Sequence, residues 1–203
     1  MKLKKRILGL LLALSIITVP TTQAFAAYKT PSFRCEYLGN IKNVPYRITA
    51  SANSSYINQI NLAISNWGSS SYLNIKPVLK KTTSSIYDIK FDARVISDNP
   101  SALGLTRFYL RTSGEVNANS SNWEFANIDL NTATINMSNY SKSNFPYSYN
   151  QWIIGIVAHE MGHALGLDHN SYETNSLMYP KSTGWKTYVI QKVDGDGYND
   201  IYK

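Results

Sequence analysis

Cysteine, histidine and strongly charged segments are scarce in this sequence. The scarcity of cysteine and of charged segments excludes or disfavours particular classes of protein. The single cysteine, Cys35, cannot form an intramolecular disulfide, so a disulfide-rich scaffold is excluded. Runs of lysine and arginine with interleaved aromatic residues are lacking, which leaves nucleic-acid binding without support. Beyond the first 26 residues, no segment is long and apolar enough for a transmembrane helix. The remaining length fits one domain with a proper hydrophobic core.

The first 26 residues have the composition of a secretory signal peptide. Four positive charges open the chain: Lys2, Lys4, Lys5 and Arg6. An uncharged, leucine-rich stretch at 7–19 follows, and then a small-residue pattern at 24–26. Because the stretch is too short for a membrane span, we expect cleavage after Ala26 or Ala27 and a secreted, extracellular protein without membrane attachment. Removing four positive charges lowers the formal balance from +7 to +3, and the lysine-rich signal suits a bacterial source.

All three histidines lie in one eleven-residue window that reads H-E-x-x-H-x-x-G-x-x-H. His159 and His163 are four residues apart, so on a helix they share one face and can bind a single ion. Gly166 suits a helix end with positive φ, after which the chain can turn back and supply His169 as a third ligand. Three imidazoles and one water describe a catalytic zinc site, and Glu160 can reach that water without binding the metal.

The residues around this motif favour a buried helix. The apolar run 152–158 leads directly into His159, as expected of a helix that carries ligands to the floor of a cleft. H-E-x-x-H alone occurs by chance on ordinary amphipathic helices. The glycine and the third histidine at fixed offsets argue strongly against a chance grouping of surface histidines.

The extended motif resembles that of the metzincin metalloproteases, in which a glycine and a third histidine follow the zinc helix. A methionine turn is also present at 176–180, as Ser-Leu-Met-Tyr-Pro, similar to the matrixin (matrix metalloprotease-like) branch. The resemblance implies that the three histidines bind zinc, that Glu160 is the general base and that Met178 forms the hydrophobic base of the site. It also implies an α+β fold: a twisted mixed sheet, a long helix packed on it, the zinc-binding helix, the methionine turn and a short C-terminal helix.

We therefore expect a secreted endopeptidase with one catalytic Zn²⁺, in which a zinc-bound water activated by Glu160 hydrolyses peptide bonds. Its partner is expected to be a protein or peptide substrate bound in extended form, and a monomer is the default state. Two alternatives stay open: a zinc hydrolase of a non-peptide or cell-wall amide substrate, and a non-catalytic secreted binding protein stabilised by zinc. The second alternative has no need of Glu160. Calcium elsewhere in the domain is left open and unassigned.

Several features depart from the matrixin pattern. No histidine is left for the second, structural zinc of matrixins, so we expect that site to be absent. Asn170 follows the third histidine, where matrixins usually have serine, and Pro180 stands where astacin-like enzymes have an extra tyrosine ligand. Cys35 shares only an Arg-Cys pair with the P-R-C-G switch of matrixin proenzymes, so we expect a partly buried or idle thiol, and a thiol that gates the zinc stays open as the alternative.

The expected organisation is a signal peptide at 1–26, an N-terminal segment at 27–43 and a catalytic domain at 44–203. A helix capped at Asn53 or Ser54 is predicted by an apolar stripe at helical spacing: Ile57, Ile60, Ile64 and Trp67. Five segments have the composition or alternation of strands: 44–50, 73–79, 86–92, 104–110 and 133–137.

Two further segments of the catalytic domain have an expected role or structure. The resemblance to metzincins implies an edge strand above the zinc that pairs with extended substrate, and by element order segment 102–109 is the candidate for it. Segment 112–127, rich in Gly, Asn and Ser, is expected to be a surface loop.

The C-terminal segment admits two interpretations. Asp194 and Asp196, each followed by glycine, open like a calcium loop, but an EF-hand loop needs a bidentate glutamate at position twelve and a flanking helix, which cannot be completed before Lys203. Asp194, Gly197 and Tyr202 resemble instead the closing helix of matrixin domains. We adopt that interpretation, with Asp194 near the helix N-terminus.

Overall fold

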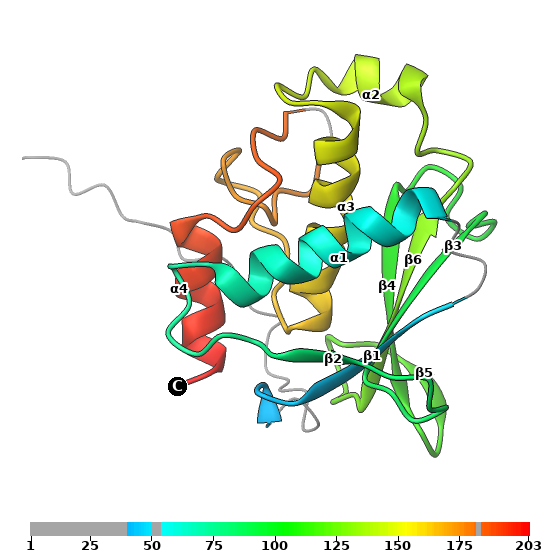
Figure 1. Cartoon of the computed structure of the whole chain (residues 1–203), viewed down its shortest axis with the longest axis vertical. Helices are drawn as coiled ribbons and strands as arrows, with labels where there is room; N and C mark the ends of the chain where they lie inside the picture. The colour runs from blue at the N-terminus through cyan, green and yellow to red at the C-terminus, as the bar shows by residue number, and fades with distance from the viewer. Residues whose placement is uncertain (1–39, 50–53, 182–183) are drawn as a thin grey trace, which may run out of the picture.

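The computed structural model describes residues 40–49, 54–181 and 184–203. These residues form a six-stranded mixed sheet and four helices, joined by turns and loops (Figure 1). The strands are β1 (Val44–Ile48), β2 (Leu79–Lys81), β3 (Ile89–Arg94), β4 (Gly104–Leu110), β5 (Gly114–Val116) and β6 (Phe125–Asn131). The helices are α1 (Ser54–Ser69), α2 (Met137–Ser143), α3 (Tyr149–Ala164) and α4 (Lys192–Ile201). The predicted α+β fold class, with its mixed sheet and long helices, is confirmed.

The sheet has the strand order β2-β1-β3-β6-β4-β5. β1 pairs in parallel with β2 and β3, and β3 pairs in parallel with β6. β4 runs antiparallel to β6, and β5 runs antiparallel to β4. β5 pairs only with residues 108–110 of β4, so within the described residues the first half of β4 has no strand on its outer side. That half of β4 is therefore a sheet edge.

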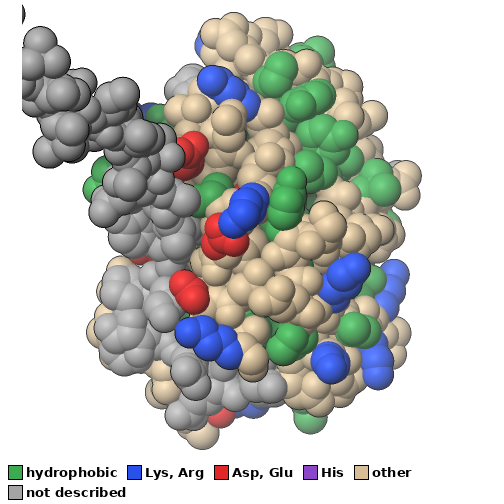
Figure 2. Space-filling model, turned by 90° about the vertical axis from the view of Figure 1, so that its left-hand side faces the viewer, with side chains coloured by type: hydrophobic (Ala, Val, Ile, Leu, Met, Phe, Trp, Pro, Cys, Tyr) green, Lys and Arg blue, Asp and Glu red, His purple; other side chains and the backbone are tan. Residues whose placement is uncertain are grey.

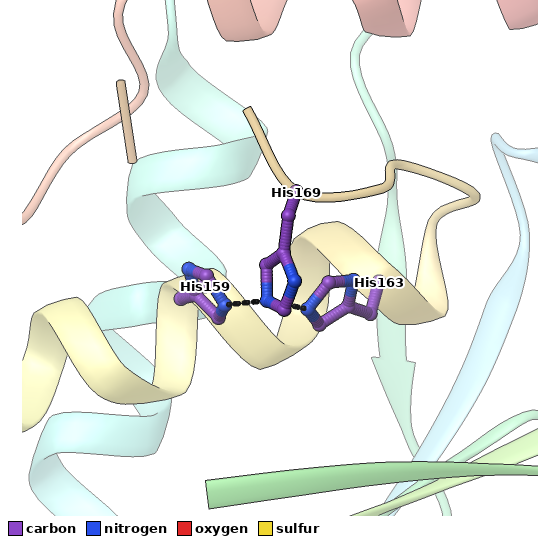
Figure 3. A group of neighbouring side chains, drawn as sticks. All are labelled: His159, His163 and His169. Carbon is purple, nitrogen blue, oxygen red and sulfur yellow. Dashed lines mark hydrogen bonds between the residues drawn. The ribbon is translucent and has the colours of Figure 1, made fainter. Parts of the chain in front are cut away.

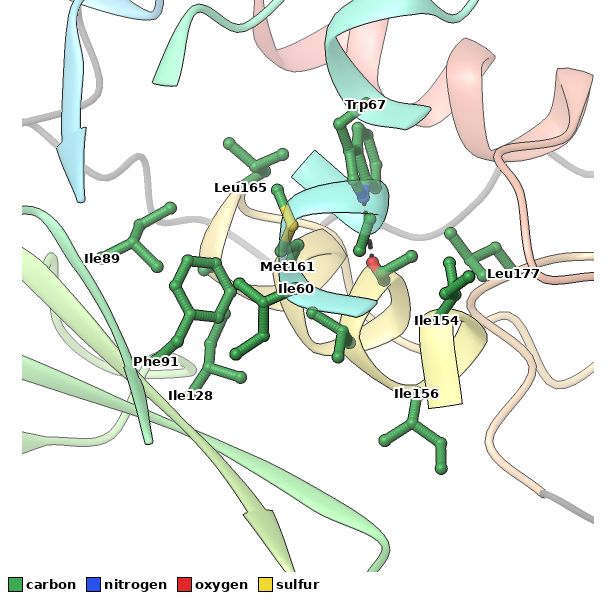
Figure 4. Close-up of a cluster of buried hydrophobic side chains, with 14 of the residues drawn as sticks. Ile60, Trp67, Ile89, Phe91, Ile128, Ile154, Ile156, Met161, Leu165 and Leu177 are labelled. Atoms are coloured by element: carbon green, nitrogen blue, oxygen red, sulfur yellow. Dashed lines mark hydrogen bonds between the residues drawn. The ribbon is translucent and has the colours of Figure 1, made fainter. Parts of the chain in front are cut away.

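The hydrophobic core lies between the sheet and the helices α1 and α3. Ile60 and Trp67 of α1 meet Phe91 of β3 and Met161 of α3 in one cluster of fully buried side chains (Figure 4). The Trp67 indole Nε1 donates a hydrogen bond to the Ala158 carbonyl oxygen at 3.0 Å. This bond ties α1 directly to α3. Of the apolar stripe predicted for α1, Ile60 and Trp67 are confirmed as core and Ile64 packs against it, whereas Ile57 is half-buried.

Most predicted strands are present. β4 has the predicted bounds 104–110, β1 ends at Ile48 instead of residue 50, and β3 spans 89–94 instead of 86–92. Side chains of β3 alternate between buried and half-buried, as a strand with one covered face requires.

The strand predicted at 73–79 is wrong. Only Leu79 of this segment belongs to β2. Pro77 has no N–H to donate to a ladder, and the backbone N–H of Asn74 donates to the Asn199 side chain at 2.8 Å. The start of the segment is therefore bound to α4, and only its end reaches the sheet, where Val44 N donates to Val78 O at 3.0 Å.

Segments 112–127 and 133–137 also differ from the prediction. The first was expected to be a loop but contains β5 and the start of β6. The second was expected to be a strand but is a turn, in which Ile135 N donates to Asn131 O at 2.9 Å and Asn136 caps α2. The asparagine-rich and serine-rich stretch lies at 117–122, between β5 and β6, and the loop prediction extended it too far on both sides. β6 itself pairs with β3 on one side and β4 on the other.

The surface carries charges of both signs. On the face shown in Figure 2, basic and acidic side chains are interspersed with uncharged polar ones. Among the residues that the structure describes, no helix has both the length and the apolar character to cross a membrane. The predicted signal peptide, Cys35 and the candidate cap Asn53 lie outside the described residues.

Asp194, in the first turn of α4, anchors the segment that precedes this helix. Its Oδ2 accepts hydrogen bonds from Leu177 N at 2.9 Å and Gln191 N at 2.8 Å, and its Oδ1 accepts one from Met178 N at 3.3 Å. The Ser176 hydroxyl also donates to Oδ1. These donors occupy the carboxylate, so α4 is the expected closing helix and its interpretation as a calcium loop has no support.

Replacing Asp194 with Ala should lower the free energy of unfolding by about 3–5 kcal/mol, because it leaves several buried donors without an acceptor. Asp196→Ala is the matched control: this half-exposed carboxylate pairs with Lys192 one helical turn away, and its loss should cost under about 1 kcal/mol. Urea unfolding of the zinc-free chain measures both. Equal midpoints for the two variants would contradict the anchoring role.

Candidate metal centre

Helix α3 carries the first two histidines and the glutamate. It begins at a capping box in which Ser148 Oγ accepts from Gln151 N at 3.4 Å and Gln151 Oε1 accepts from Ser148 N at 3.1 Å. Nearly all of its later residues are buried, which fixes the rotation of the helix against the core. His159 and His163 therefore project from one face, one turn apart (Figure 3).

Gly166 ends α3 and redirects the chain. Its φ is 91°, a conformation that favours glycine. Gly166 N donates to His163 O at 2.8 Å, and Leu167 N donates to Gly162 O at 2.9 Å, a pattern typical of a helix end with a left-handed glycine. The chain then returns over the helix and brings His169 above the other two rings (Figure 3). The role predicted for Gly166 is confirmed.

The three imidazoles converge on one point. His169 Nε2 lies 3.3 Å from His159 Nε2 and 3.2 Å from His163 Nε2. Among the described residues, these histidines form a group whose ligand atoms all lie within 4.8 Å of one another. Tetrahedral zinc with Zn–N bonds of about 2.0–2.1 Å would hold its nitrogens about 3.3–3.4 Å apart. The donor set and the two separations from His169 fit zinc, and the ligand atoms of His159 and His163 lie within 4.8 Å of each other.

Hydrogen bonds to the outer ring nitrogens prepare two of these rings for a metal. His159 Nδ1 lies 2.7 Å from the Leu177 carbonyl oxygen, and His163 Nδ1 lies 2.8 Å from that of Leu167. A carbonyl accepts only, so each Nδ1 carries the proton and each Nε2 keeps its lone pair. Burial lowers the pKa of all three imidazoles, that of His159 well below its usual range and that of His163 to about 4. The rings are therefore neutral near pH 7, as metal binding requires.

Glu160 is buried between α3 and β4. The Thr106 hydroxyl lies 2.7 Å from Glu160 Oε2 and 2.9 Å from the Glu160 backbone carbonyl oxygen. A Cβ atom added at Gly104 would lie 2.7 Å from Glu160 Cγ, so β4 can approach this closely only with glycine there. Burial raises the pKa of the Glu160 carboxyl to about 7. The hydrogen bond from Thr106 acts in the opposite direction and lowers this pKa, but burial has the larger effect.

The histidines and Glu160 open into a cleft of about 740 Å³. One wall is formed by residues 101–108, which include most of β4, and another by residues 115–119. Pro180 and Trp185 line the cleft as well, together with Ile156 of α3. The cleft therefore runs along the unpaired half of β4 and past the three imidazoles.

Comparison with known families decides the assignment. The matrixin family profile matches residues 39–203. The chain belongs to the matrixin family. Its fold is also similar to a chain in a solved structure described as the GM1 bound form of the ECX AB5 holotoxin, with a TM-score of 0.53 and 15% identity, over 88% of this chain and 85% of that chain. At that identity the similarity concerns the fold alone. Membership in the family supports a zinc metallopeptidase.

The methionine turn of this matrixin lies beneath the zinc-binding helix. Met178 is fully buried, and its backbone carbonyl accepts a hydrogen bond from Asn170 N at 2.8 Å. Gly162 on α3 faces it: a Cβ atom there would lie 2.3 Å from Met178 Sδ. The thioether thus packs directly against the helix backbone between His159 and His163, where the resemblance predicted a hydrophobic base.

Asn170 holds the loop that follows His169. Its side chain is fully buried, and its Oδ1 accepts hydrogen bonds from Tyr172 N at 3.1 Å and Glu173 N at 3.3 Å. The asparagine is therefore compatible with the matrixin fold although it departs from the usual serine. In the next segment, Pro180 lines the cleft, in line with the expectation that no tyrosine acts at that position.

The structure brings together all four residues predicted for the site, and it adds Thr106, Gly104 and Trp185, which the sequence did not indicate. Threonine and glycine within a strand are common, so no pattern distinguishes Thr106 or Gly104 from residues of any other strand. Trp185 lies in a segment without periodicity, and only its position shortly after the methionine turn could have drawn attention to it.

Replacing His169 with Ala removes one of the three proposed zinc ligands. Loss of a residue that only hydrogen-bonds to a ligand typically weakens metal binding by ~10–100-fold, so we expect the loss of His169 itself to weaken zinc binding by more. We expect the wild-type chain to hold about one zinc after dialysis and the variant to hold much less. Zinc per protein, measured by atomic emission, tests this. Glu173→Ala, an exposed change in the same loop, is the control and should keep the metal. Full zinc retention by His169→Ala would contradict the three-histidine site.

Replacing Gly162 with Ala should lower the free energy of unfolding by about 1–3 kcal/mol, because the new methyl group overlaps Met178. Gly68→Ala, near the end of α1, is the matched control: its nearest contact would be 3.6 Å away, and alanine favours a helix by up to about 1 kcal/mol. Thermal or urea unfolding should therefore move the two variants in opposite directions. A neutral Gly162→Ala would show that Met178 can move aside.

Proposed function

We propose that the chain is a secreted zinc-dependent endopeptidase that hydrolyses proteins or peptides bound in extended form. The observation that carries the proposal is the arrangement of four side chains in one cleft: three imidazole Nε2 atoms around one point, and a buried carboxylate from the same helix beside them. Membership in the matrixin family supports a more general statement than this proposal, namely that the protein is a zinc metallopeptidase.

His159, His163 and His169 would hold the metal through their Nε2 atoms, since the Nδ1 atoms of the first two face backbone carbonyls. Three protein ligands leave one coordination position open, which is typical of a catalytic and not a structural zinc site. Zinc bound there supplies Lewis acidity: it polarises a carbonyl oxygen and lowers the pKa of water towards ~7.

Glu160 is the proposed general base. Its Oε2 is engaged by Thr106, and among the described residues no group donates to Oε1, which is left to receive a proton. As water adds to the scissile carbonyl carbon, its proton passes to the Glu160 carboxylate. The same proton then passes to the leaving amine nitrogen when the C–N bond breaks. Thr106 acts as a positioning residue that keeps the carboxylate turned towards the cleft.

The edge of β4 offers backbone groups to an extended substrate. Leu103 O accepts from Asn131 N and Tyr109 O accepts from Glu124 N, so odd-numbered residues of β4 face β6. Backbone groups alternate along a strand, and those of Gly104 and Thr106 therefore face the cleft. In the described part of the chain they have no backbone partner, and a peptide could pair with them as an added strand.

Export rests on the N-terminal sequence. The basic first residues, the apolar stretch at 7–19 and the small residues at 24–26 support a signal peptide and thus an extracellular enzyme.

Glu160→Gln should keep the zinc and lower the turnover of casein by about 10²–10⁴-fold, because the amide cannot take a proton. Glu115→Gln is the matched control, since it makes the same chemical change on the cleft wall in a mostly exposed side chain. The measurement is release of casein fragments by the mature chain, with and without a zinc chelator, beside a cell-wall amide substrate.

Cleavage that survives in Glu160→Gln would refute the role of general base. Hydrolysis of the cell-wall substrate without cleavage of casein or gelatin would refute the endopeptidase in favour of a non-peptide hydrolase.

A further inference from the structure

The loop between β3 and β4, residues 95–103, forms part of the wall of the metal cleft. Five of its residues line the cleft: Asp98, Asn99, Ser101, Ala102 and Leu103. Most of the loop is exposed, and it contains neither helix nor strand. Ordering a loose segment when a ligand binds costs affinity. The loop can therefore bind an extended peptide well only if contacts outside it keep it in place.

Neutral hydrogen bonds hold the two ends of this loop. Asn131 of β6 is fully buried; its Nδ2 donates to Ala102 O at 2.9 Å, and its Oδ1 accepts from Ile96 N at 3.3 Å. The Thr134 hydroxyl donates to the same Ala102 carbonyl oxygen at 2.7 Å. Both ends are thus fixed to β6 and to the turn that follows it, and the exposed residues 97–99 lie between these two anchors.

One guanidinium connects this middle part of the loop to the sheet. Thr106 of β4 contacts Glu160, and successive side chains of a strand point to opposite faces, so Arg107 projects from the face of the sheet away from Glu160. Arg107 Nη2 donates to both carboxylate oxygens of Asp98 at 2.8 Å, and Nη1 donates to Asp129 of β6. Arg107 thus connects β4 and β6 with the loop.

The sheet side of this connection is rigid. The side chain of Asp129 is 1% exposed and that of Arg107 is 10% exposed, whereas that of Asp98 is 67% exposed. Arg94 of β3 donates a second hydrogen bond to Asp129 at 2.7 Å, so two guanidiniums share one buried carboxylate. A planar guanidinium held in this way presents its remaining N–H groups in a fixed direction. The exposed Asp98 is therefore the partner whose position Arg107 determines.

We propose that Arg107 is a positioning residue: through Asp98 it holds the loop 95–103 in place as a wall of the cleft, so that a peptide meets a surface that is already ordered. That the occupant of the cleft is a peptide rests on the proposed function. The three histidines come from α3 and the segment after it, and not from this loop. Loss of the Arg107–Asp98 pair therefore weakens the binding of a peptide and leaves binding at the metal unchanged.

The first experiment measures hydrogen exchange in the loop by mass spectrometry, on the zinc-loaded mature chain. Asp98→Asn removes the charge on the loop and leaves the Arg107–Asp129 pair intact. Arg107→Lys keeps a positive charge beside Asp129 but loses the fork that spans two carboxylates. Each variant should speed exchange at 95–103 by about 2–5-fold, while peptides from β3 and β6 exchange as in the wild type. The double variant should exchange no faster, because both changes remove the same contact.

Glu115→Gln is the matched control for exchange. The Glu115 carboxylate lies 3.9 Å from Arg107 Nε, so this change removes a charge near the same guanidinium, but in β5 and not in the loop. Exchange at 95–103 should stay at the wild-type rate. Salt gives a further check: raising NaCl from about 0.05 M to about 1 M screens an exposed ion pair and should speed loop exchange in the wild type more than in Asp98→Asn.

The second experiment measures binding without turnover. A short peptide hydroxamate with uncharged side chains, and acetohydroxamate, which has no peptide, are titrated calorimetrically into each zinc-loaded protein. Asp98→Asn and Arg107→Lys should each weaken binding of the peptide compound by about 2–10-fold, because the peptide must then order the loop. Binding of acetohydroxamate should not change. A residue that only stabilises the fold would alter the affinity for neither compound, or for both equally.

The outcomes separate the two proposals. Unchanged exchange at 95–103 in both variants, or equal effects on the two hydroxamates, overturns the role of Arg107 even if casein is cleaved. Faster exchange with unchanged affinity for the peptide hydroxamate overturns it as well. Faster exchange and weaker binding of the peptide hydroxamate alone, in a chain that cleaves no peptide, overturn the peptidase proposal and leave the positioning role standing.

Discussion

One geometric requirement organises this molecule: three imidazole nitrogens must meet at a point about 2 Å from each of them. Two of them can be supplied by one helix only if that helix does not rotate or slide. The structure meets this condition by burying α3 on nearly every side, between α1, β4 and β6 and above the methionine turn. The third nitrogen must arrive from the opposite direction, which requires the abrupt reversal at Gly166.

The second support of the site is polar and lies well away from the histidines in sequence. Asp194 accepts hydrogen bonds from the backbone N–H groups of Leu177 and Met178 and so binds this segment to α4. The Leu177 carbonyl oxygen in turn accepts a hydrogen bond from His159 Nδ1. The Asp194 carboxylate in α4 is thus two hydrogen bonds away from His159, one of the proposed metal ligands. Met178 fills the space under α3 that this arrangement creates. Thr106 gives the same kind of support to Glu160 from the sheet side.

The site could be predicted from sequence because its chemistry demands particular residue types at fixed spacing. Histidines spaced by four and then six residues, with a glycine between the second and the third, are characteristic of a zinc site, and the structure brings them together as predicted. The strands of the sheet were harder to predict from the sequence. β6 does alternate apolar Ala126, Ile128 and Leu130 with polar residues, but the asparagine-rich and serine-rich segment before it favoured the prediction of a loop up to residue 127. Pairing with β3 and β4 then buries most of the strand. The segment before β2 shows the reverse: an apolar alternation that is typical of a strand, broken by Pro77 and by an asparagine from α4.

The β4–β5 hairpin limits how much of a substrate the sheet can hold. Because β5 already pairs with the second half of β4, Gly104 and Thr106 are the residues of this strand whose backbone groups face the cleft unpaired, so β4 allows a substrate at most four main-chain hydrogen bonds. Hydrogen bonds between main chains do not depend on the side chains of the peptide. Because few such bonds can form along β4, they contribute little sequence-independent affinity. Discrimination among peptides would then fall mainly on side chains near the cut. A peptidase built this way would select short, locally unfolded stretches of a protein chain and would not need a long extended partner.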